Sequence, residues 1–119
     1  MPKSAKAKSL PYLKFLNLVD ALRGMPTSPK IDPIEERLLD LLAIAWSSGR
    51  QVTVLEAMRM SPDRSSATVH RLLKSMLKKG VIELRPDADD GRVKHVVPTT
   101  ATNQYFARLN QCLLKVARS

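Results

Sequence analysis

The segment from Ser61 to Thr99 constrains the fold of this 119-residue chain more than any other part. In order, it has the pattern of an amphipathic helix, a glycine, a β-branched strand, a charged turn and a second strand. Gly80 separates the helix from the first strand, and Asp90-Gly91 marks the turn between the strands. A helix followed directly by such a hairpin predicts a winged helix-turn-helix, a mainly α fold with a small β-hairpin (α+β).

The helix of this segment has one apolar face and one basic face at about 100° per residue. The apolar face carries Val69, Leu72, Leu73, Met76 and Leu77. The opposite face carries Arg64, Ala67, Arg71, Lys74 and Lys78, with Thr68 and Ser75 at its edge. No acidic residue lies between Arg64 and Lys79, so the i,i+4 ion pairs of an ordinary exposed helix are missing. A cation-only face favours a polyanionic partner, and a solvated lysine-rich face is the alternative.

The composition agrees with such a partner. The formal net charge is +9, and the hydrophobic fraction of 44% suffices for the core of one domain. The single cysteine excludes an intrachain disulfide, which fits a reducing cytosol. The first nine residues are basic, but no long apolar stretch follows them, so neither a signal peptide nor a membrane span is expected. The expected location is cytoplasmic.

Prolines, glycines and capping residues divide the chain into four parts. Residues 1–9 form a lysine-rich tail that is expected to be disordered. Residues 10–31 contain a helix from about Leu10 to Arg23, which Gly24 ends, and a proline-rich linker. Residues 32–98 form the winged-helix domain, and residues 99–119 a last helix that Thr99 or Thr100 caps.

Two capping boxes predict the helices that support the basic helix. Asp32, with Pro33 and Glu35 after it, begins a helix to about Ser47, which Gly49 ends. Its buried residues are expected to be Ile34, Leu38, Leu41, Leu42 and Ala45. The second capping box, Thr53 with Glu56, begins a short helix of about Val54 to Met60.

The start of the basic helix is open between two positions, Pro62 and the residue after Ser65. After this helix, Val81 to Leu84 and Val93 to Val97 are predicted strands. The residues from Pro86 to Arg92 form the hairpin turn, centred on Asp90-Gly91.

From Asp32 to Thr99 the chain resembles the MarR family of bacterial transcription regulators. Four strings of residues carry the resemblance: Thr68-Val69-His70-Arg71-Leu72-Leu73, Leu77-Lys78-Lys79-Gly80-Val81-Ile82, Asp90-Gly91-Arg92 and Pro98-Thr99. His70-Arg71-Leu72-Leu73 also resembles the IclR family, and the Asp-x-Arg wing favours MarR. A typical member binds DNA as a two-fold dimer and often responds to small aromatic ligands. This chain is shorter at its C-terminus, so we expect the first property and leave a small-molecule effector open.

Under this interpretation the N-terminal part of the basic helix approaches base edges. The residues placed there are Arg64, Ser65, Ser66, Ala67, Thr68 and Arg71. Arg71 or Arg64 is suited to a bidentate pair with guanine, and Ala67 or the Thr68 methyl to a thymine methyl. Lys74 and Lys78, farther along, are expected on phosphates.

In the wing, Arg92 is expected to reach the DNA backbone or a narrow minor groove, with a solvated turn residue as the alternative. Arg85 and Lys94 flank the wing and add to its positive field. By resemblance to the Asp-x-Arg motif, Asp90 orients Arg92.

The two terminal helices carry apolar faces that a small domain has little core to cover. On the first helix these residues are Tyr12, Phe15, Leu16, Val19 and Leu22, and on the last they are Tyr105, Leu109, Cys112, Leu113 and Val116. Pairing with a second copy would bury both faces and would set two recognition helices about 34 Å apart, one DNA turn. The alternative is that both helices fold back on their own domain.

No other motif predicts a chemistry. Asp87, Asp89 and Asp90 cluster in the turn without His or Cys at metal-ligand spacing, and neither a catalytic constellation nor a phosphate-binding glycine loop is visible. We therefore expect no metal, no cofactor and no enzyme. The predicted function is a sequence-specific transcription regulator on double-stranded DNA. The alternatives are a non-regulatory DNA-binding module (phage or plasmid maintenance, or architectural) and a winged-helix protein-interaction domain or basic RNA-associated protein.

Overall fold

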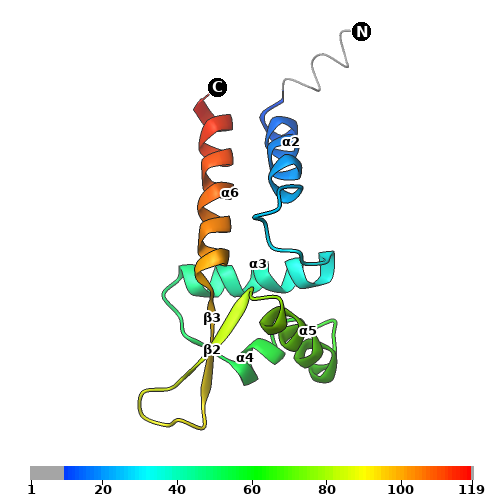
Figure 1. The fold of residues 1–119 in the computed structure, drawn as a ribbon. Helices are drawn as coiled ribbons and strands as arrows, with labels where there is room; N and C mark the ends of the chain where they lie inside the picture. The colour runs from blue at the N-terminus through cyan, green and yellow to red at the C-terminus, as the bar shows by residue number, and fades with distance from the viewer. Residues whose placement is uncertain (1–9, 119) are drawn as a thin grey trace. The chain divides into compact units, whose positions relative to one another are not determined.

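The computed structural model describes residues 10–118 (Figure 1). The predicted basic tail at residues 1–9 lies outside the described residues. The described chain divides into two compact units, residues 30–102 and residues 10–29 with 103–118. No helix in the described part is long and apolar enough to cross a membrane.

The unit of residues 30–102 has the predicted α+β composition. Its elements are α3 (Pro33–Ser47), β1 (Val52–Thr53), α4 (Val54–Met58), α5 (Ser66–Lys78), β2 (Ile82–Pro86) and β3 (Lys94–Pro98). The strands form an antiparallel sheet in the order β1-β3-β2. Figure 1 shows the β2–β3 hairpin extending away from α3 and α5. The sequence did not predict β1, because a two-residue strand has no readable alternation. The short helix α4 ends at Met58, two residues before its predicted end.

Both predicted capping boxes are present. At the start of α3, the Glu35 amide donates to Asp32 Oδ1 at 3.0 Å and the Asp32 amide donates to Glu35 Oε1 at 3.0 Å. At the start of α4, the Glu56 amide donates to Thr53 Oγ1 at 3.1 Å and the Thr53 amide donates to Glu56 Oε1 at 3.3 Å. Each box satisfies helix-terminal amides that would otherwise have no partner. These caps fix where the two helices that support α5 begin.

The apolar core of this unit lies between the helices and the sheet. Its most buried residues are Leu38, Leu39, Leu42, Val52, Val69, Met76, Val81, Ile82 and Val96. Of the five residues predicted to be buried on α3, Leu38, Leu42 and Ala45 are buried and Leu41 is half-buried, but the prediction for Ile34 is wrong, since it is 42% exposed. The buried stripe begins at Glu35, 1% exposed, and continues through Leu38 and Leu39. Glu35 thus takes the inward position that the sequence assigned to Ile34, and Lys79, the C-cap residue of α5, pairs with its carboxylate.

The second unit contains α2 (Pro11–Arg23) and most of α6 (Thr100–Arg118). The two helices lie close together, since Arg23 Nε donates to the Tyr105 hydroxyl at 3.2 Å. Val19, Leu22, Tyr105 and Val116 are buried, and Phe15, Leu109 and Cys112 are half-buried. Tyr12, Leu16 and Leu113 are exposed, by 68%, 43% and 53%. The apolar residues of these helices are therefore partly covered within one chain and partly left on its surface.

Candidate nucleic-acid interface

Helix α5 begins at the later of the two positions that the sequence allowed. Ser65 is the N-cap, and its Oγ accepts a hydrogen bond from the Thr68 amide at 3.1 Å. The Ser65 and Thr68 hydroxyls also share a hydrogen bond of 2.9 Å. The segment before Ser65 is a turn, closed by a hydrogen bond of 3.0 Å from the Arg64 amide to the Ser61 carbonyl. The alternative start at Pro62 is wrong, because this single turn is not continued and α5 begins only at Ser66.

The two faces of α5 are arranged as the helical periodicity predicts. Val69, Leu73 and Met76 are buried, and Leu72 and Leu77 are half-buried. The opposite face exposes Ser66, Ala67, His70, Arg71, Lys74 and Lys78. In the described part of the chain, no carboxylate forms an ion pair with Arg64, Arg71, Lys74 or Lys78. The helix therefore presents cationic groups that are free to meet an external anion.

The last cation of this region, Lys79, is not part of that face. Its ammonium pairs with the buried carboxylate of Glu35 on α3. Burial raises the pKa of Glu35, but hydrogen bonds from Lys79, the Asp32 amide and Ser75 outweigh it and hold the pKa below its ordinary value. Glu35 is therefore ionised at neutral pH, and Lys79 is engaged in the core rather than offered to DNA.

The wing is the loop from Asp87 to Val93 between β2 and β3. Its ends are joined by the Asp87 amide, which donates to the Val93 carbonyl at 2.8 Å. The Val93 amide donates to the Asp90 carbonyl at 3.0 Å, which closes a β-turn with Gly91 and Arg92 at its centre. The sequence placed the centre at Asp90-Gly91, one residue too early. Positive φ is confined to Gly49 and Gly80 in the described chain, so Gly91 does not form the primed turn that Asp-Gly predicts.

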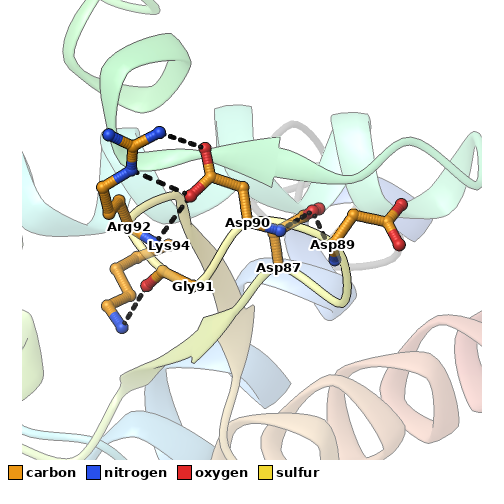
Figure 2. Close-up of polar contacts among 6 residues, drawn as sticks. All are labelled: Asp87, Asp89, Asp90, Gly91, Arg92 and Lys94. Atoms are coloured by element: carbon orange, nitrogen blue, oxygen red, sulfur yellow. Dashed lines mark hydrogen bonds and ion pairs between the residues drawn. The ribbon is translucent and has the colours of Figure 1, made fainter.

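Asp90 and Arg92 face each other across this turn (Figure 2). Arg92 donates from its amide and its Nε to Asp90 Oδ1 at 3.1 and 3.2 Å, and its Nη2 lies 3.5 Å from Oδ2. The Arg92 side chain is nevertheless 93% exposed. This is the contact that an orienting aspartate would make, and it leaves most of the guanidinium open to solvent.

The remaining predicted wing cations are exposed and locally bonded. Arg85 Nη2 lies 3.1 Å from Glu83 Oε1 on the same strand. Lys94 Nζ donates to the Gly91 carbonyl at 2.8 Å, which Figure 2 also shows. Surface contacts of this kind are weak and exchange readily with other anions. Arg85 and Lys94 thus remain suited to adding positive potential beside Arg92.

Sequence reasoning missed two residues that shape the wing, Asp87 and His95. Asp87 Oδ1 lies 2.7 Å from His95 Nε2 on β3. The hydrogen bond from His95, followed by those from the Asp89 and Asp90 amides, lowers the pKa of Asp87. In the sequence, Asp87 is recognisable only as one of three clustered acids in the turn, because neither periodicity nor a motif connects it to a histidine eight residues away.

A groove of about 580 Å³ runs between α4 and the wing. It is lined by Thr53, Val54, Leu55, Met58, Arg92, Val93 and Lys94.

In the described chain, no group of three or more His, Cys, Asp or Glu side chains is arranged to hold a metal ion. The candidate site consists of the exposed face of α5, with the turn before it, and the wing with its flanking residues. All eleven of its predicted DNA-binding residues lie in the unit of residues 30–102.

Three solved structures resemble this chain. MepR of S. aureus, bound to ethidium bromide, has a TM-score of 0.67 and 18% identity over 88% of this chain and 71% of its own. Apo (heme-free) PefR has a TM-score of 0.55 and 18% identity over 89% of both chains. A probable transcriptional regulator from Pseudomonas aeruginosa has a TM-score of 0.53 and 18% identity over 88% of this chain and 75% of its own.

At 18% identity, the likeness to these structures shows the fold of the chain. The chain therefore has the MarR-type winged-helix fold that its sequence predicts. No protein-family model and no curated protein sequence matches the chain.

Proposed function

We propose that the chain is a sequence-specific transcription regulator that binds double-stranded DNA as a homodimer. Helix α5 enters the major groove, and the wing contacts the backbone or the minor groove. One observation carries the proposal: the charged residues on the exposed face of α5, Arg71, Lys74 and Lys78, are all cations, and no described carboxylate pairs with them. The proposal is supported by the fold that the chain shares with MepR, PefR and a probable transcriptional regulator.

The residues of α5 divide into two roles along the helix. Ser66, Ala67 and Arg71 are exposed near its start and are suited to base edges, with Arg64 in the turn before them. The Ser65 and Thr68 hydroxyls bond to each other, and each still has the capacity to accept a further hydrogen bond. Lys74 and Lys78, in the later turns, are suited to phosphates. The first turns of α5 would therefore recognise the base sequence, and its last turns would add affinity that does not depend on sequence.

The dimer rests on the apolar residues that α2 and α6 leave exposed. Tyr12, Leu16 and Leu113 remain on the surface of their own unit, and Leu114, the residue after Leu113, is 40% exposed. Val19, Leu22, Tyr105 and Val116 are already buried within the chain, so we assign them to the packing that supports the interface. A second copy would cover the exposed residues and match the two-fold symmetry of a palindromic site.

No residue of the proposed interface performs a chemical step, so we propose a binding protein and not an enzyme. A bacterial-type regulator of this kind would act in the cytoplasm. Its readout is occupancy of a DNA site, which depends on affinity and on the preference for that site over random DNA.

Selection of bound duplexes from a random pool, followed by a salt titration, tests the proposal. We expect one enriched palindromic sequence with half-sites about 10 base pairs apart. We also expect the logarithm of affinity to fall with the logarithm of salt concentration, by about 0.9 per phosphate contact. A salt-dependent affinity without an enriched sequence would favour an architectural DNA-binding module. If affinity does not depend on salt and no sequence is enriched, the result would favour a protein-interaction domain.

A further inference from the structure

We infer that Asp87 and His95 are positioning residues, which hold the wing loop in the conformation that presents Arg92 to DNA. The inference rests on the proposed function, because it assumes that the wing contacts DNA. It adds two residues that touch no nucleic acid themselves.

Asp87 organises the start of the wing loop through three hydrogen bonds to its carboxylate. Its Oδ2 accepts from the Asp89 amide at 3.0 Å and from the Asp90 amide at 3.1 Å, as Figure 2 shows. Its Oδ1 lies 2.7 Å from His95 Nε2. Since an ionised carboxylate only accepts hydrogen bonds, the histidine is the donor. Asp87 therefore joins two amides of the loop to a side chain of the sheet.

His95 is a fixed anchor for this contact because it lies on the central strand. On β3 it pairs with Thr53 of β1 and with Arg85 of β2. Its side chain is only 14% exposed, and its Nδ1 is buried with no hydrogen-bond partner among the described residues. The hydrogen bond to Asp87 is then the one directional contact of the imidazole in the described structure.

The contacts continue from Asp87 to the tip of the wing. The backbone of Asp90 is held by Asp87, and the carboxylate of Asp90 is held against the Arg92 amide and guanidinium. A loop fixed in this way has less conformational freedom to lose when Arg92 meets a phosphate. Loss of the Asp87 carboxylate would free the Asp89 and Asp90 amides and, through them, the orientation of Arg92.

The negative charges of the wing make it possible to distinguish a positioning role of Asp87 from a purely electrostatic effect on DNA binding. Asp87, Asp89 and Asp90 place three carboxylates where a DNA-binding surface would repel phosphate. The carboxylate of Asp89 accepts no hydrogen bond from the described residues, whereas that of Asp87 accepts three. Removing either charge should tighten DNA binding if charge alone matters. Removing Asp87 should weaken it if Asp87 positions the wing.

This difference gives a matched test on the full chain and the selected duplex. We expect Asp87→Ala to weaken binding roughly 3- to 10-fold, about the effect of one lost phosphate contact, and to lower the salt slope by about one. Asp89→Ala should leave affinity unchanged or raise it. His95→Gln, which keeps an N–H donor, should bind like the wild type, and His95→Leu should bind like Asp87→Ala. Thermal unfolding of each variant is the control that checks whether the fold persists.

A double-mutant cycle with Arg92 decides whether the effect passes through the wing. In an Arg92→Ala background, Asp87→Ala should have no further effect on affinity. The inference is overturned if Asp87→Ala tightens binding as Asp89→Ala does, or if its full effect persists without Arg92. It is also overturned, with the proposed function intact, if Arg92→Ala leaves affinity unchanged while Arg71→Ala weakens it. If the wild type binds no duplex, both the inference and the proposed function fail.

Discussion

The ammonium of Lys79 lies against the carboxylate of Glu35, whose side chain is 1% exposed. Lys79 caps the C-terminal end of α5, and Glu35 belongs to the capping box at the start of α3. One ion pair thus connects the end of the proposed recognition helix to the start of a supporting helix. Its removal should affect the stability of the unit more than its DNA contacts.

Replacing Lys79 with methionine tests this connection. The Glu35 carboxylate would stay buried with hydrogen bonds from the Asp32 amide and Ser75 only, and we expect a loss of about 3 kcal/mol in the free energy of unfolding. Lys78→Met, one residue earlier on the exposed face, is the matched control and should change stability by less than about 0.5 kcal/mol. Urea denaturation measures both. Equal effects of the two substitutions would contradict a structural role for the pair.

The same pair predicts how stability depends on pH. The pKa of Glu35 lies below its ordinary value of 4.5, so the unfolded chain binds a proton at a higher pH than the folded chain does. The stabilisation is therefore present above the unfolded pKa and is lost as pH falls through the lower folded pKa. Glu35→Gln lacks this contribution. The difference in unfolding free energy between wild type and Glu35→Gln should shrink as pH falls below the ordinary pKa of 4.5. A constant difference would refute this assignment.

The parts of the fold that local patterns encode could be predicted from the sequence. The faces of α5 follow from the spacing of Val69, Leu73 and Met76, and the starts of α3 and α4 follow from residues three apart in the chain. Caps and periodicity act over a few residues, so a single sequence contains them completely. The cation-only face of α5 was predicted for the same reason.

The parts that depend on distant partners could not be predicted. Lys79 pairs with a residue 44 positions away, and only the folded core shows that Glu35 replaces Ile34 as the inward residue. The hydrogen bond of His95 with Asp87 depends on the register of β2 and β3, which places them together. The turn of the wing is closed by the bond from the Val93 amide to the Asp90 carbonyl, so its centre lies one residue later than the sequence predicted. These features depend on contacts or strand pairing in the folded chain, which the local sequence pattern does not contain.

The two ends of α5 should respond differently to truncation. Arg71→Ala should cost about 1–3 kcal/mol at the selected site and relax the preference for particular bases. Lys78→Ala should weaken binding evenly across sequences and lower the salt slope by about one. Lys14→Ala, an exposed lysine of α2, is the control for net charge and should change neither quantity. Titrations of selected and random duplexes at several salt concentrations measure all three. If Arg71→Ala and Lys78→Ala behave alike, the proposed division of roles is wrong.

The dimer predicts that a charge on the exposed apolar surface of α6 separates the copies. Leu113 is 53% exposed, so Leu113→Asp should leave the chain folded while it places a carboxylate in the proposed interface. Ile44 on α3 is 65% exposed and lies outside the proposed interface, so Ile44→Asp is the matched control. Light scattering at micromolar concentration should find a dimer for wild type and Ile44→Asp, and a monomer for Leu113→Asp. Because a monomer occupies one half-site, Leu113→Asp should also lose the preference for a palindrome over a single half-site. A monomeric wild type, or a Leu113→Asp variant that stays dimeric, would count against this interface.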